Sequence, residues 1–255
     1  MFKHFIIRNL HSLLGFENYL FIFSVIKIRT LELDSRKKEF VFFSRMFKED
    51  SNVLILGANT GITTVPVARN ISKGRVIAIE PVPDNFKTLV SVTDYFKCRN
   101  VTALNFALGK ENRDIEMYMP VINKTKSHGL AYVNDESIEG FEEGIKYRVM
   151  MKKLDSVEEV SDLKIDGIKI VAENYEKNIL EGGKDTLMKH RPLIYCELWF
   201  NENRKNTLSL IKSWNYEIRI LNNGKLIPAD ESLIKTKNLF FIPAERTGEF
   251  KNYII

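Results

Sequence analysis

Cysteine is scarce in this chain. Its 255 residues include two cysteines, Cys98 and Cys196, and neither has a second cysteine or a nearby histidine at the spacing of a zinc site. We therefore expect no metal centre and no thiol catalysis. So few cysteines are typical of a reducing compartment, and the simplest interpretation is a cytoplasmic protein.

Long apolar runs and dense tracts of one charge are also missing. The longest early apolar run, Tyr19–Ile26, is interrupted by Ser24 and is much shorter than the roughly 20 residues that span a bilayer. The 38 Lys and Arg residues outnumber the 33 Asp and Glu residues, but they are spread along the chain, so no nucleic-acid partner is expected. With 13 Gly, 7 Pro and 44% apolar residues, the chain is typical of a globular protein of one large or two small domains.

The first fifty residues are predicted to form a helical N-terminal extension. Lys3 and Arg8 alternate with apolar residues, and no small-residue cleavage site follows, so the segment is expected to stay in the mature protein. Packing onto the domain is the common fate of such a helix. A peripheral membrane contact through residues 1–30 and a homodimer contact are the alternatives.

Residues 51–255 are predicted to form one α/β domain with a parallel, doubly wound sheet, because short apolar runs alternate there with amphipathic stretches. A β-rich cap insertion is expected at about residues 114–154, where Pro and Gly punctuate short alternating pieces. The predicted strands are Val53–Leu56, Arg75–Glu80, Val101–Ala107, Gly167–Ala172, Leu193–Leu198, Tyr216–Leu221 and Asn238–Ile242. One predicted helix follows the first strand and its turn and ends at about Asn70, and two others span Pro83–Phe96 and Tyr175–His190. The sequence Asn222-Asn223-Gly224 marks a turn.

The turn after the first strand carries the strongest ligand signal. It reads Gly57-Ala58-Asn59-Thr60-Gly61, and glycines there let the backbone approach a ligand closely. Asn59 stands where the dinucleotide fingerprint has its middle glycine, which disfavours a pyrophosphate and a nicotinamide-dependent reductase. Glu80 ends the next strand, where its carboxylate is placed to accept hydrogen bonds from ribose hydroxyls. An adenosine ligand without phosphates, S-adenosylmethionine, is therefore favoured over a merely structural turn.

Several motifs in the same order resemble those of the FkbM-type methyltransferase family, over roughly residues 50–243. They are Gly57–Gly61, Ile77–Phe86 with its Glu-Pro-x-Pro-x-Asn-Phe block, Asn105–Gly109, Leu154-Asp155, Ile168–Ile170, Glu173–Glu176 and Tyr195–Trp199. The resemblance implies a class I methyltransferase fold, Rossmann-like, with seven strands of which the last is antiparallel. It also implies methyl transfer from S-adenosylmethionine to a hydroxyl of a carbohydrate, glycolipid or related small molecule.

The resemblance also assigns residues to the cofactor. Its methionine part is expected beside the glycine turn, its ribose beside Glu80, and its adenine beside the third strand. The cofactor-binding candidates are Gly57, Ala58, Asn59, Gly61, Glu80, Pro81, Asn105, Phe106 and Ala107.

Three residues are candidates for the catalytic base. Glu173 and Glu197 follow the fourth and fifth predicted strands, and ligands of open α/β sheets bind outside the carboxyl ends of the strands. His128 lies in the cap, as a base or as a solvated loop residue. Trp199 is a candidate to stack on the acceptor or to join the core, and Arg204 to clamp an anionic acceptor or to start a solvated helix.

Three places depart from the family pattern, and one lies in the cap, where Gly129-Leu130-Ala131-Tyr132 stands in place of the Gly-Leu-Ser-His that relatives often have. Ile55 and Val171 stand where the family usually has Asp. If strand geometry continues past Val171, Glu173 points the same way and occupies nearby space. The departures keep a second hypothesis open, in which a catalytically degenerate relative acts as a binding or assembly partner.

Overall fold

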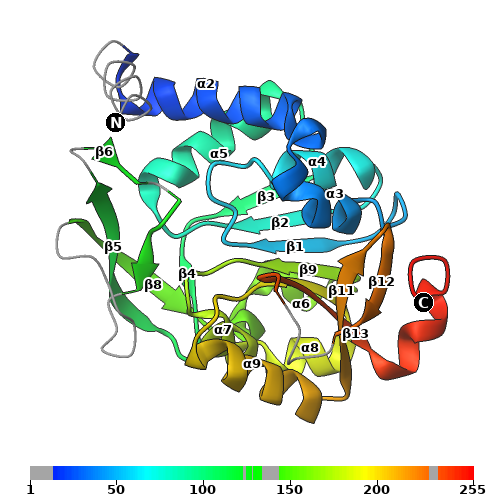
Figure 1. The fold of residues 1–255 in the computed structure, drawn as a ribbon. Coiled ribbons are helices and arrows are strands. Elements are labelled where there is room, and N and C mark those ends of the chain that lie inside the picture. Colours follow the sequence, from blue (N-terminus) through cyan, green and yellow to red (C-terminus); the bar gives the residue numbers. More distant parts are fainter. Residues whose placement is uncertain (1–13, 123–124, 128, 134–143, 230–234) are drawn as a thin grey trace.

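The computed structural model describes residues 14–122, 125–127, 129–133, 144–229 and 235–255. Its centre is an eight-stranded sheet in the order β12-β11-β13-β10-β9-β1-β2-β3, with helices on both faces (Figure 1). The strands are β1 Val53–Leu56, β2 Val76–Ile79, β3 Val101–Leu104, β9 Gly167–Ile170, β10 Leu193–Glu197, β11 Tyr216–Asn222, β12 Lys225–Pro228 and β13 Asn238–Pro243. This arrangement confirms the predicted α/β, Rossmann-like fold class.

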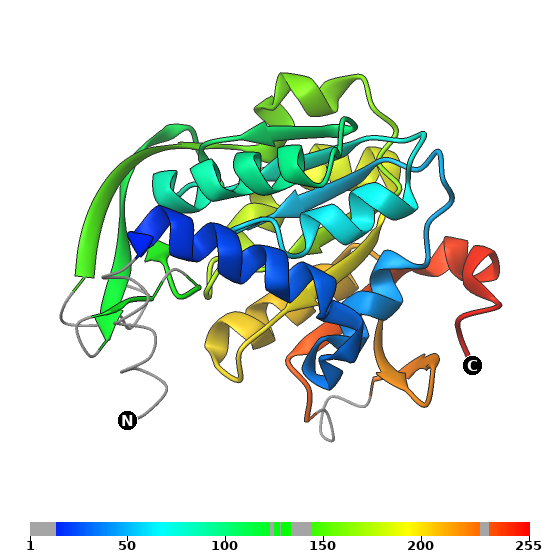
Figure 2. The ribbon, with the colours of Figure 1, turned by 90° about the horizontal axis from the view of Figure 1, so that it is seen from above.

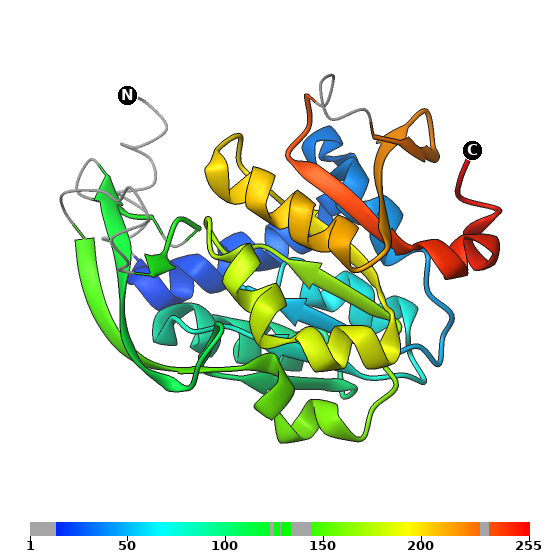
Figure 3. The same ribbon diagram turned by 90° about the horizontal axis from the view of Figure 1, so that it is seen from below.

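The central strand β1 shows why these runs are apolar throughout. All four of its residues are buried, because it pairs in parallel with β2 and with β9 while helices cover both faces. Val53 and Ile55 pack with α3 (Lys38–Ser44) and α4 (Thr64–Asn70), and Leu54 and Leu56 join the core on the opposite face. Figure 3 shows that opposite face, covered by α7 (Glu176–Gly182), α8 (Lys184–His190) and α9 (Glu202–Ser213).

Three predicted elements differ from the structure. An eighth strand, β12, follows the turn at Asn223 and Gly224, whose φ angles of 45° and 76° suit a tight hairpin. The predicted helix Tyr175–His190 is broken into α7 and α8, because glycines at 182 and 183 are poor helix formers. The predicted strand Val101–Ala107 ends at Leu104, and Ala107–Leu108 forms β4, which belongs to a second sheet.

That second sheet contains β4, β5 (Arg113–Ile122), β6 (Thr125–Lys126), β7 (Tyr132–Val133) and β8 (Gly144–Lys152). The long antiparallel pair of β5 and β8 reaches beyond the main sheet (Figure 2). Met117, Val133 and Met151 are buried and join the main core. Residues predicted as a cap therefore pack on one edge of the domain.

The N-terminal segment lies across the face that also carries α4 and α5 (Pro83–Tyr95) (Figures 1 and 2). It consists of α2 (Phe16–Arg29), the short 3-10 turns η1 (Leu31–Leu33) and η2 (Ser35–Lys37), and α3. The remaining short elements are η3 Leu154–Ser156, α6 Glu158–Ser161 and η4 Ala244–Phe250. Within the described ranges, every helix is too short or too polar to span a bilayer.

Candidate functional site

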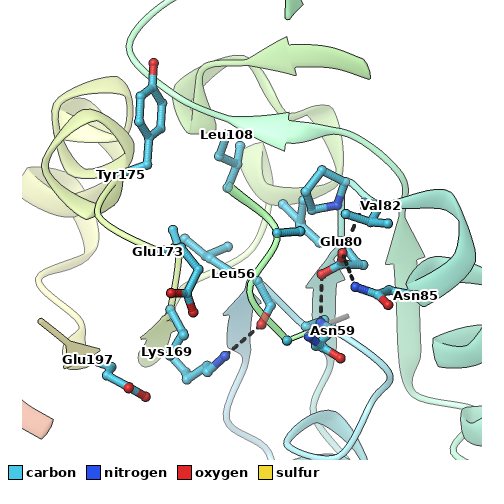
Figure 4. A pocket seen from close by; sticks show the side chains of 18 of the residues that line it. Leu56, Asn59, Glu80, Val82, Asn85, Leu108, Lys169, Glu173, Tyr175 and Glu197 are labelled. Atoms are coloured by element: carbon cyan, nitrogen blue, oxygen red, sulfur yellow. Dashed lines mark hydrogen bonds between the residues drawn. The ribbon is translucent and has the colours of Figure 1, made fainter. Parts of the chain in front are cut away.

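A cavity of about 400 Å³ opens at the carboxyl ends of β1, β2, β9 and β10 (Figure 4). Its lining includes seven of the nine cofactor candidates: Gly57, Ala58, Asn59, Glu80, Pro81, Phe106 and Ala107. The base candidates Glu173 and Glu197 also line it. Sequence segments that lie far apart therefore meet at one edge of the sheet, as open α/β topology requires.

The glycine turn is built by contacts within the chain. Gly57 has a φ of +75°, and a Cβ there would lie 2.0 Å from the carbonyl oxygen of Val171. The backbone N–H groups of Gly57 and Ala58 both donate to the carbonyl of Ile79 at 3.0 Å. The close approach of the chain after β9 therefore requires glycine at position 57. Gly61 packs against Leu89 and does not line the cavity.

Glu80 is 4% exposed and accepts three hydrogen bonds. Its Oε2 accepts from the backbone N–H of Asn59 at 2.8 Å, and its Oε1 accepts from Val82 N at 3.0 Å and Asn85 Nδ2 at 3.2 Å (Figure 4). Burial raises the pKa of the Glu80 carboxyl, and the three donors oppose that shift. A carboxylate has roughly four acceptor positions, so about one is left for a ligand hydroxyl, where the sequence predicted two such bonds.

Asn105 supports the backbone of the site and does not line the cavity. Its Nδ2 donates to the carbonyls of Glu80 at 2.8 Å and Pro81 at 3.1 Å. The side chain therefore holds the backbone that carries Glu80.

Glu173 and Glu197 lie across the cavity from Glu80 (Figure 4). Strand β9 ends at Ile170 and not at the predicted Ala172, so the condition that strand geometry continues to Glu173 is not met. Glu173 and Asn174 instead have φ angles of 43° and 73°, a left-handed conformation that costs energy in residues other than glycine. Asn201 Nδ2 supports this bend by donating to Asn174 Oδ1 at 2.6 Å.

Burial, together with the neighbouring carboxylates of Glu197 and Glu176, raises the pKa of Glu173 to about 7. Glu176 itself is buried as the first residue of α7, where its Oε1 accepts from Ala172 N at 3.0 Å. Glu173 therefore places a carboxyl group with a pKa near neutral pH at this edge of the sheet.

Lys169 was missed by the sequence analysis. It is 4% exposed within β9, and its Nζ donates to the carbonyl of Gly57 at 2.7 Å (Figure 4). Burial lowers its pKa to about 8, while Glu197 and Glu80 oppose that shift. The available signal was a lone lysine inside the apolar strand predicted over Gly167–Ala172, since a buried ammonium needs a partner.

Other predicted residues have diverse positions. His128 lies outside the described residues. Trp199 lines the cavity, and the Lys237 ammonium lies 3.1 Å from the centre of its indole ring system. Arg204 is buried, its Nη1 donates to the Leu198 carbonyl at 3.0 Å, and it does not line the cavity as an anion clamp would. The helix α9 does begin at Glu202 with an exposed first residue, as the alternative predicted.

The two positions at which the chain lacks the family's usual Asp lie in different surroundings. Ile55 is fully buried in the core and does not line the cavity, whereas Val171 does. Valine in place of Asp at position 171 therefore changes the cavity wall. Isoleucine in place of Asp at position 55 changes the core packing behind that wall.

Residues 56–220 match the family model for the methyltransferase FkbM domain. Among solved structures, a methyltransferase FkbM from Methylobacillus flagellatus is similar with a TM-score of 0.51 at 16% identity, over 76% of this chain and 44% of that one. The chain thus spans less than half of that protein. The cofactor-bound Rv0187 from MTB is similar with a TM-score of 0.50 at 10% identity, over 92% and 94% of the two chains. At these identities the structures show a shared fold. No curated protein matches the sequence.

Proposed function

This chain belongs to the FkbM methyltransferase domain family, and from that premise we propose that it is an S-adenosylmethionine-dependent O-methyltransferase acting on a hydroxyl of a carbohydrate, glycolipid or related small molecule. The observation that carries the proposal is one cavity with Glu80 on one side and Glu173 and Glu197 on the other. The thiols of Cys98 and Cys196 are free, which supports a reducing, cytoplasmic location.

The cavity suits the cofactor in size and in chemistry. Its volume of about 400 Å³ lies in the range of ligand pockets, and its wall combines apolar Phe106 and Leu108 with the buried carboxylate of Glu80. Glu80 retains about one acceptor position for a ribose hydroxyl, and Phe106 and Ala107 would border the adenine. When bound, S-adenosylmethionine supplies an electrophilic methyl group on its sulfonium.

The residues of the chain supply alignment and proton transfer. Holding a nucleophile in line with a transferred group is worth up to about 7–11 kcal/mol in favourable cases. Glu173 in its ionised form accepts the proton of the acceptor hydroxyl, because a base with a pKa of about 7 is half ionised at neutral pH. Such assistance supplies roughly 10²–10⁴-fold. The negative charge of neighbouring Glu197 stabilises the protonated form of Glu173 after the proton has been transferred.

The alternative is a degenerate relative that works as a binding or assembly partner. The observation that favours it is apolar Val171 on the cavity wall, where the family usually has a carboxylate. The two hypotheses differ in turnover, so one experiment separates them.

The experiment combines calorimetry with a transfer assay. S-adenosylmethionine and S-adenosylhomocysteine are expected to bind more tightly than NAD, and labelled methyl is expected to reach a member of a panel of neutral and acidic sugars. Tighter binding of NAD refutes the cofactor assignment. Cofactor binding without transfer to any acceptor in the panel favours the non-catalytic alternative.

A further inference from the structure

The cavity has a wall that lies outside the family match. Lys37, the last residue of η2, and Phe40 of α3 both line it, while the match begins at residue 56. Phe40 is almost fully buried, and its ring lies 6.2 Å from that of Tyr195, another lining residue. The N-terminal extension is therefore part of the cavity.

The extension is also joined to the glycine turn. The Ser24 hydroxyl on α2 donates to the Thr60 hydroxyl at 2.7 Å, and both side chains are fully buried. Thr60 directly follows Asn59, whose backbone N–H binds Glu80. Because η1 and η2 connect α2 to α3 without a long loop, this buried bond helps to fix the position of Lys37 relative to the turn.

Lys37 presents a positive charge to this wall. Asp34, an acid of the extension, already pairs with Arg36 at 2.7 Å and Lys27 at 3.6 Å, and no acidic side chain of the described ranges forms an ion pair with Lys37. Lys169 is the other basic residue of the lining, and Gly57 O accepts from its ammonium. The positive charge of Lys37, in addition to burial, lowers the pKa of Lys169, because the two ammonium groups repel each other.

We propose that Lys37 binds the carboxylate of the methionine part of S-adenosylmethionine. This inference rests on the proposed function. With the ribose at Glu80 and the methyl facing Glu173 and Glu197, the amino-acid end is left for the wall formed by the glycine turn and the extension. An ammonium group is a strong partner for a carboxylate there.

Two ligands test the assignment. S-adenosylhomocysteine carries the carboxylate, whereas 5′-methylthioadenosine keeps the adenosine and thioether but lacks the amino-acid group. We expect Lys37→Gln to weaken the binding of S-adenosylhomocysteine about 3- to 30-fold, which is the effect of a partly exposed ion pair. The same substitution should leave the affinity for 5′-methylthioadenosine unchanged. Lys37→Arg should keep wild-type affinity to within about threefold, and the loss in Lys37→Gln should shrink at high salt.

Lys38→Gln is the matched control, because Lys38 is also exposed, is adjacent and does not line the cavity. It should change neither dissociation constant. Equal losses for both ligands in Lys37→Gln, or no loss for S-adenosylhomocysteine, would overturn the assignment while the wild-type protein still binds. A wild-type protein that binds neither ligand overturns the proposed function, and this inference with it.

Discussion

Replacement of Glu80 by alanine removes the acceptor of three hydrogen bonds at once. The backbone N–H of Val82 and the amide of Asn85 are then left buried without this partner, and so is the N–H of Asn59 at the turn. Each lost bond to a charged acceptor costs about 1.5–3 kcal/mol, and the desolvation that raises the pKa of Glu80 offsets part of the sum. We expect the free energy of unfolding to fall by about 2–4 kcal/mol, with a Tm lower by roughly 4–16 °C.

Urea unfolding and calorimetry with S-adenosylhomocysteine measure both consequences of this change. Binding should weaken by about 1–3 kcal/mol, because the ribose loses a buried acceptor. Glu80→Gln should lose about half as much stability, since its oxygen still meets Val82 and Asn85 while its amide nitrogen faces Asn59. Glu202→Ala is the control, because that side chain is 71% exposed and, in the part of the chain that the structure describes, forms its ion pair with Lys205. An unchanged free energy of unfolding in Glu80→Ala would refute the reasoning.

Four further substitutions probe the site, the N-terminal helix packed beside it and the core behind it. Glu173→Gln should reduce the rate of methyl transfer roughly 10²–10⁴-fold and abolish the rise of that rate through pH 7. In the wild type, the free energy of unfolding should fall as the pH rises from about 4.5 to 7, because the folded state holds the Glu173 proton more tightly than the unfolded state, and Glu173→Gln should remove this fall. Unaltered pH–rate and pH–stability profiles would contradict this. Ser24→Ala should destabilise the protein by about 1–2 kcal/mol in urea unfolding, because the buried Thr60 hydroxyl loses its donor, and a change within error would show that the bond is dispensable. Val171→Asp should raise turnover in the labelled-methyl assay with little loss of stability, whereas Ile55→Asp should lower the free energy of unfolding by at least about 3 kcal/mol; equal stabilities would show that Ile55 tolerates a charge.

The sheet was predictable because its strands carry the signal in their own residues. Val53–Leu56 is apolar on both faces, and that pattern alone indicates a strand covered by helices. The strand β12 was missed because its short sequence, Lys-Leu-Ile-Pro, is distinguished mainly by its partner β11. The helix break at Gly183 was missed although the glycine pair at 182 and 183 is a local signal, and Leu154 occupies the space that a Cβ on Gly183 would need.

The site was predictable to the extent that its residues follow strands. Glu80, Glu173 and Glu197 follow β2, β9 and β10, and the topology brings their ends together. Lys37 could not be found in this way, because it comes from a 3-10 turn whose position depends on tertiary packing. The backbone bend at Glu173 is likewise set by distant neighbours such as Asn201.

The pairing of β1 bears on how the chain folds during synthesis. Its partner β2 follows within the same βαβ unit, but its partner β9 comes much later, as the bond between Asn52 and Asp166 across 114 residues illustrates. At about 5–20 residues per second, the ribosome needs roughly 6–20 s to add that length. During this interval one edge of a fully apolar strand has no partner, and such edges recruit other chains. Slower initiation or a chaperone that shields residues 53–56 should therefore raise the yield of native protein more than any change at the surface of the finished fold.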